Sequence, residues 1–91
     1  MKTQIIQVEA HDDTISIKDK MEWSQTHRIL LVLPFRKKVL QNQLALVVLE
    51  RHCASLGSQL AIASRDPDIR FHARSLGNPV YGSKKEAQLQ S

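Results

Sequence analysis

Residues 28–82 constrain the fold most, because strand-like and helix-like patterns alternate through them, with helix-capping or turn-forming residues between the patterns. Two unbroken apolar runs, at 29–33 and 60–63, are each followed by a helical pattern that a glycine closes. Unbroken Ile, Leu and Val, rather than alternation with polar residues, is typical of parallel strands covered on both faces. The alternation therefore predicts a parallel sheet with helices packed against it.

The remaining elements follow from shorter signals on either side of these runs. We expect further strands at 5–8 and 79–81, and helices over 16–24 and 43–56. A third helix should begin at Asp66, an N-cap residue that is followed by a proline at the first helical position. Together these elements predict a sheet of about four strands.

Several side chains have an expected place in these helices. Ser16 with Asp19 resembles a capping box, although the β-branched pair at 14–15 leaves an extended conformation open there. Trp23 is expected to anchor the first helix to the core. Asn42 is a reasonable N-cap for the second helix. Helical spacing predicts a buried stripe on the second helix at Leu44, Val48, Leu49, Cys53 and Leu56, and one on the third at Ile69, Ala73 and Leu76.

The predicted architecture is one small three-layer α/β/α domain, Rossmann-like, over residues 1–83. Residues 84–91 are expected to be a tail or the start of a truncated helix, because a second capping box at 83–86 is followed by only five residues. From this we expect the chain to be a piece of a longer protein.

Composition narrows the class of protein. A chain of 91 residues with 42% hydrophobic and 24% charged residues suits one globular domain. Its single cysteine, Cys53, excludes an internal disulfide and a cysteine-rich zinc site, and it fits a reducing compartment. The apolar runs are far shorter than the roughly 20 residues that a membrane span needs. We therefore expect a cytoplasmic domain, free or belonging to a membrane-associated protein.

Polar residues follow each predicted strand, at 11–13, 36–38, 64–66 and 83–84. Ligands of open parallel sheets bind beyond the carboxyl ends of the strands, and a net charge of +4 favours an anion there. The hypothesis is a site for a nucleotide, a phosphate or a nucleic acid. Its candidate ligand-binding residues are Arg36, Lys37, Lys38, Arg65, Asp66 and Lys84.

No catalytic or metal-ligating set stands out. The segment at 34–38 lacks the glycines that a dinucleotide or Walker-type site needs, and no His-x₃-His or Cys-x₂-Cys spacing occurs. Asp12, Asp13 and Asp66 could meet around a magnesium ion, but Asp66 is more simply explained as a helix cap. We therefore predict a non-catalytic domain without a cofactor or a metal.

Residues 60–66 and 73–81 resemble the carboxyl-terminal half of PIN-type ribonucleases. In that family a strand ends in Thr-x-Asp, and a helix with Ala-x-x-x-Gly and a strand with Pro-Val follow. Only Asp66 matches one of the family's metal-binding acids, and Leu33 and Pro34 stand where another acid would end the first core strand. The resemblance implies a shared fold, with a divergent metal-dependent nuclease as the last alternative.

Most of the chain between 12 and 87 is similar to amino-terminal domains of large uncharacterised bacterial proteins, including cyanobacterial ones. The shared patterns are Ser-Ile-x-Asp-x-x-x-Trp at 16–23, Leu-Leu-Val-Leu-Pro at 30–34 and Arg-His-x-x-x-Leu-Gly at 51–57. The resemblance implies that further, often membrane-embedded, regions follow this domain, and it implies no chemistry. The missing catalytic set, the small size and the unfinished last helix predict an interaction or regulatory domain that contacts other domains of the same protein or a separate protein. Binding of an anionic ligand is the alternative function.

Overall fold

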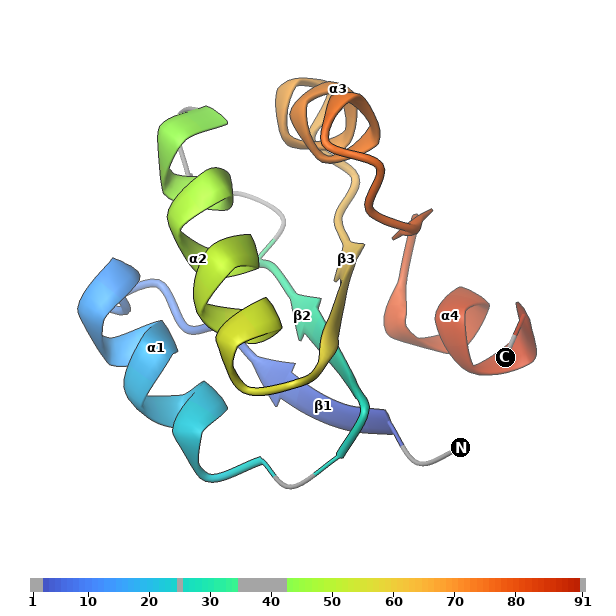
Figure 1. The fold of residues 1–91 in the computed structure, drawn as a ribbon. Coiled ribbons are helices and arrows are strands. Elements are labelled where there is room, and N and C mark those ends of the chain that lie inside the picture. Colours follow the sequence, from blue (N-terminus) through green and yellow to red (C-terminus); the bar gives the residue numbers. More distant parts are fainter. Residues whose placement is uncertain (1–2, 25, 35–42, 91) are drawn as a thin grey trace.

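The structure, a computed structural model of the chain, describes residues 3–24, 26–34 and 43–90. Strands and helices alternate throughout this part of the chain (Figure 1). In order they are β1 (Thr3–Gln7), α1 (Thr14–Glu22), β2 (Arg28–Val32), α2 (Gln43–Ser55), β3 (Gln59–Ala63), α3 (Pro67–Ser75), β4 (Val80–Tyr81) and α4 (Lys84–Gln90).

The four strands form one parallel sheet, and their order in space, β1-β2-β3-β4, is their order in the chain. The two apolar runs lie side by side at its centre, with Leu30 opposite Ala61 and Leu31 opposite Ile62. The predicted α/β class and the parallel sheet of four strands are confirmed, and the arrangement is consistent with a small Rossmann-like fold.

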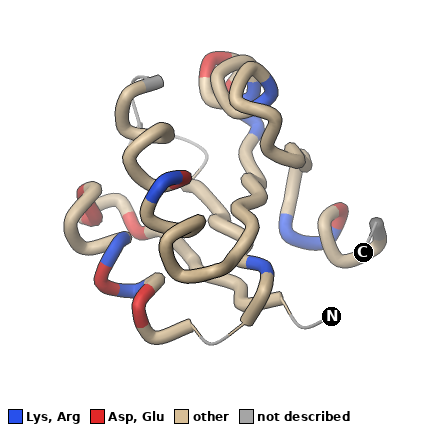
Figure 2. Tube along the Cα trace, viewed as in Figure 1, with Lys and Arg blue, Asp and Glu red and all other residues tan. Residues whose placement is uncertain are grey.

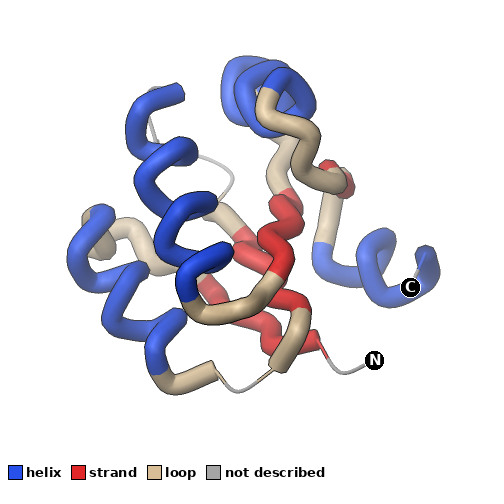
Figure 3. Tube along the Cα trace, in the orientation of Figure 1, coloured by secondary structure: helices blue, strands red, loops and turns tan. Residues whose placement is uncertain are grey.

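The helices are divided unequally between the two faces of the sheet (Figures 1 and 3). Helices α1, α2 and α3 pack on one face, where they bury the larger apolar cluster of the described residues. Because the strand order follows the chain, three crossovers of the same hand place all three helices on the same side. Only α4 covers the other face in the described part of the chain, through Ala87 against Leu30, Ala61 and Ala63.

Helix α1 begins two residues before the predicted start. Asp13 is the N-cap: its Oδ1 accepts a hydrogen bond from Ser16 N at 2.8 Å, and Asp13 N donates to Ser16 Oγ at 2.9 Å. The predicted capping box of Ser16 with Asp19 was therefore wrong, because Ser16 is the last residue of this box and not its first. The extended alternative for 14–15 was also wrong, since both residues are helical.

One expectation about buried side chains was wrong, and another was right only in part, since Leu49 and Cys53 of the stripe predicted on α2 are buried. Trp23 follows the last turn of α1 and is 87% exposed, so it does not anchor the helix. On α2 the buried residues are Leu46, Leu49 and Cys53, whereas Leu44 is 69% exposed. Val48 and Leu56 are exposed too. The apolar residues 44–49 surround the helix axis, so the pattern alone did not identify the side that faces the sheet.

The ends of the helices follow their sequence signals closely. Gly57 and Gly77 have positive φ angles of 76° and 81°, as expected for glycines that stop a helix. The amides of the next residues return to the helices, Ser58 N to Cys53 O at 3.0 Å and Asn78 N to Ala73 O at 2.9 Å. The predicted stripe of α3 is confirmed by the burial of Ile69 and Ala73, with Leu76 packed against them.

The carboxyl-terminal segment folds as a helix. Ser83 Oγ accepts a hydrogen bond from Glu86 N at 3.1 Å, so the predicted second capping signal is used. Helix α4 then runs to Gln90. The loop expected after β2 and the Asn42 cap lie outside the described residues.

Candidate functional site

A cavity of about 250 Å³, open to solvent on one side, lies at the carboxyl ends of β3 and β4. The chain leaves β3 toward α3 on one face of the sheet, and it leaves β4 toward α4 on the other face (Figure 1). Adjacent strands whose loops leave in opposite directions produce the crevice in which open α/β sheets bind ligands. The cavity is lined by Val32, Leu33, Ala63, Ser64, Arg65, Gly82, Ser83 and Lys84.

Ser64 is the most firmly held polar residue of this cavity. It is only 5% exposed, and Ser64 N donates to Tyr81 O at 2.9 Å. Its carbonyl oxygen accepts from Arg70 Nη1 at 2.9 Å, and its Oγ accepts from Asp66 N at 3.1 Å. The hydroxyl hydrogen of Ser64 has no acceptor among the described residues, so it is available to a ligand.

The carboxylate of Glu86 binds the backbone of Gly82, a residue that lines the cavity. Its Oε2 accepts a hydrogen bond from Gly82 N at 2.8 Å. A Cβ at Gly82 would lie 2.8 Å from that oxygen, so a side chain here would push the carboxylate away. Glu86 itself does not line the cavity. Its charge is thus directed to the backbone of the β4–α4 turn.

The six predicted anion-binding residues do not all line this cavity. Arg65 and Lys84 line the same cavity from its two sides, although 18 positions separate them in the chain. Asp66 does not line it; its Oδ1 caps α3 by accepting from Asp68 N at 2.9 Å. The other three candidates, Arg36, Lys37 and Lys38, lie outside the described residues.

The acidic residues considered for magnesium have structural roles. Asp12 accepts hydrogen bonds from Lys20 Nζ at 2.6 Å, Ser16 Oγ at 2.8 Å and Glu9 N at 2.8 Å. Burial alone would raise the pKa of Asp12, but these hydrogen bonds outweigh it and lower the pKa to about 2. Asp13 and Asp66 are helix caps. Within the described residues, no three His, Cys, Asp or Glu side chains are grouped to hold a metal ion.

Cys53 is buried in the main core. Burial, together with the nearby charge of Glu50, raises the pKa of its thiol to about 11. A thiol that stays protonated at neutral pH is a poor nucleophile. The predicted burial of Cys53 is confirmed.

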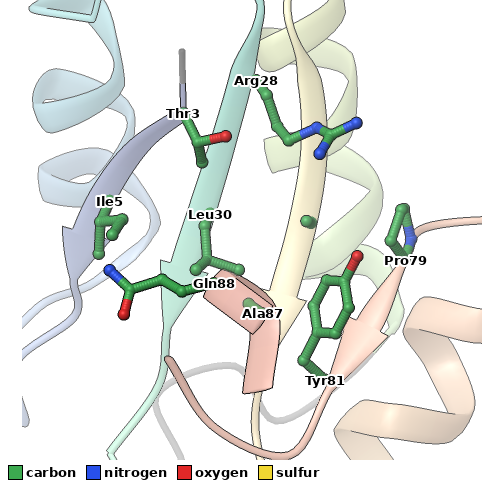
Figure 4. Close-up of a pocket in the computed structure, with 9 residues that line it drawn as sticks. Thr3, Ile5, Arg28, Leu30, Pro79, Tyr81, Ala87 and Gln88 are labelled. Carbon is green, nitrogen blue, oxygen red and sulfur yellow. The ribbon is translucent and has the colours of Figure 1, made fainter. Parts of the chain in front are cut away.

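A second feature, which the sequence did not suggest, lies on the opposite face of the sheet beside α4 (Figure 4). It is a shallow groove, which we call the α4 groove. Its lining residues are Thr3, Ile5, Arg28, Leu30, Ala61, Pro79, Tyr81, Ala87 and Gln88. Alternate residues of the strands at the centre of the sheet point to this face. That alternation was hidden in unbroken apolar runs, and the covering segment was expected as a tail or the start of a truncated helix.

The charges of the described residues form no single patch. Lys or Arg and Asp or Glu occur together on each helix, as Figure 2 shows. Arg65 is also near Arg70 and Arg74, beside Phe71 on the outer side of α3. The grouping at the strand ends differs from it, because it combines cations from two loops with the buried hydroxyl of Ser64.

The chain matches no family model, and no curated protein or solved structure is similar to it at a significant level. Among the described residues, no helix is both long and apolar enough to cross a membrane.

Proposed function

We propose that this chain is a non-catalytic interaction or regulatory domain of a larger bacterial protein, working on the cytoplasmic side. One observation supports the proposal: α4 alone covers the second face of the sheet in the described chain. Next to it Ile5 and Val32 are only partly buried, and Leu89 of α4 is 77% exposed. This side of the domain offers apolar surface to another protein segment.

The physical reason is the usual structure of α/β domains. Parallel sheets are normally covered by helices on both faces, because their strands are apolar on both. Helix α4 has seven residues and buries Ala87 alone among its described side chains. A partner that covered the α4 groove and Leu89 would gain about 2 kcal/mol from that leucine alone. We infer that the partner is another domain of the same protein or a separate protein with an apolar surface.

A site-specific photo-crosslinker tests this proposal in the full protein expressed from its own gene. With the crosslinking residue at Leu89, we expect a defined adduct, and mass spectrometry should map it to one apolar segment. The matched control places the same residue at Leu44, which is equally exposed but belongs to α2 on the other side of the sheet. Equal adducts at both positions, or none at Leu89, would contradict the proposal.

A further inference from the structure

We propose that the cavity between the ends of β3 and β4 binds the phosphate group of a small phosphomonoester. This inference does not depend on the interaction function proposed above. The two concern opposite parts of α4: Ser83 and Lys84 at its start line the cavity, whereas Ala87 and Gln88 line the α4 groove.

The first step in the inference is topological. The chain passes from the face of the sheet that holds three helices to the opposite face only after β4. The loops 64–66 and 82–83 are therefore the one adjacent pair of the described chain that leaves the sheet in opposite directions. The general rule for open α/β sheets places a ligand at such a point, and the cavity is found there.

The second step concerns the groups that face the cavity. Arg65 supplies a planar guanidinium and Lys84 an ammonium, one from each side, and both side chains are exposed. No hydrogen bond or ion pair within the described residues engages either side chain. The hydroxyl of Ser64 adds a donor from the buried floor. Two cations and a hydroxyl donor match a phosphate dianion, whereas no carboxylate is among the described residues that line the cavity.

The third step concerns size. Sites for drug-sized ligands usually measure about 300–1,000 Å³, and this cavity, at about 250 Å³, falls just below that range. Its floor includes the apolar residues Val32, Leu33 and Ala63, which suit the uncharged part of a small ligand. A nucleic acid strand would instead need a row of cations along a groove. Arg65, Arg70 and Arg74 group on the outer side of α3, but the other described lysines and arginines are spread over α1, β2, α2 and α4 (Figure 2). The cations therefore form no continuous row, and a small molecule is favoured.

Titration followed by ¹⁵N-HSQC NMR tests the proposal, with inorganic phosphate and ribose 5-phosphate as probes and sodium chloride at matched ionic strength as the blank. We expect shifts of the amides of 64–65 and 82–84, with dissociation constants of the order of millimolar, and tighter binding of ribose 5-phosphate. Absence of localised shifts at roughly 10 mM of either probe would overturn the proposal.

Variants separate specific binding from general attraction. Arg65→Ala and Lys84→Ala should each weaken binding of ribose 5-phosphate about two- to fivefold, and the double variant should weaken it further. The matched controls, Arg74→Ala and Lys85→Ala, remove the same charge outside the cavity and should leave binding unchanged. The exposed position of all four side chains means that each variant should keep a folded spectrum.

Two other outcomes would overturn the inference. Equal weakening by the control variants would show that net charge, and not this cavity, attracts the anion. A single-stranded oligonucleotide that binds more tightly than ribose 5-phosphate, with shifts spread along α3 and sensitive to Arg74→Ala, would assign the surface to nucleic acid instead.

Discussion

At the scale of single residues, one of the three carboxylates considered for magnesium, Asp12, is half of an ion pair. Asp12 is almost completely buried, and Lys20 Nζ lies 2.6 Å from its Oδ2. Because the backbone of Glu9 and the hydroxyl of Ser16 also donate to it, the carboxylate form is strongly favoured. Asp12 thus fixes the β1–α1 connection to α1.

This ion pair makes the stability of the protein depend on pH in the acid range. The pKa of Asp12 is about 2 in the folded chain, against 3.8 as the ordinary value. A depressed pKa contributes stability above the unfolded value and loses it as pH falls from about 4 toward 2. We expect Asp12→Asn to cost about 1–2 kcal/mol of unfolding free energy at pH 6, and the difference from wild type to shrink toward pH 2.

Urea denaturation between pH 2 and pH 6 measures this difference. Asp19→Asn is the control, because Asp19 is an exposed acid of the same helix. Its difference from wild type should stay small at every pH. A gap between wild type and Asp12→Asn that is independent of pH would show that the carboxylate is not held in its charged form.

At the scale of elements, α2 shows why a helix can be predicted from the sequence although the side that faces the sheet cannot. Residues 43–56 were expected to be helical, and Gln43–Ser55 are. The face that packs on the sheet carries Leu46, Leu49 and Cys53, while Leu44 faces outward. With apolar residues on all sides of its first turns, only the packing of the whole domain decides which of them are buried.

Two leucines of α2 give a direct check of this orientation. Leu49 is fully buried, so Leu49→Ala should lower the unfolding free energy by about 2–5 kcal/mol. Leu44 is largely exposed, so Leu44→Ala should change it by no more than about 0.5 kcal/mol. Chemical denaturation of both variants measures the contrast. Equal losses would mean that α2 is rotated about its axis relative to the structure.

At the scale of the whole molecule, the domain has one well-covered face and one thinly covered face. Three helices bury the larger apolar cluster, whereas α4 buries only Ala87 among its described side chains. A helix of seven residues is not stable on its own in water. Helix α4 should therefore be the first described helix to open when the domain fluctuates.

Native-state hydrogen exchange can test this order of opening. We expect the amides of α4 to exchange much faster than those of Ile29 and Ile62 at the centre of the sheet. Ala87→Glu should remove the remaining protection of α4 and leave the central strands protected, because it places a charge against apolar residues. Lys85→Glu introduces the same side chain at an exposed position and serves as the control. Global unfolding of Ala87→Glu would contradict a separable α4.

The predictable parts of the fold are those that depend on residues close together in the sequence. Asp66 before Pro67 marks the start of α3, and two glycines mark helix ends. The cap of α1 was ambiguous, because Asp13 with Ser16 and Ser16 with Asp19 are equally good local pairs. Strand order and the face that each helix takes depend on long-range packing, so no local pattern could supply them.

The candidate site likewise has a part that was predictable from the sequence and a part that was not. Arg65 and Lys84 follow strands, so their position at one edge of the sheet was predictable. Their meeting in one cavity was not, because it requires β3 and β4 to be neighbours with helices on opposite faces. The role of Ser64 depends on its burial against α3 and β4, which only the assembled domain creates.

The strands lie in the sheet in the same order as in the chain, and this order affects how the sheet can form. Every hydrogen-bonded strand pair joins a strand to the one synthesised immediately before it. As the chain emerges from the ribosome, the neighbour of each new strand has already been synthesised. No strand pair that formed earlier has to separate so that a later strand can insert between its members. Growth of the sheet can therefore keep pace with translation, one β–α unit at a time.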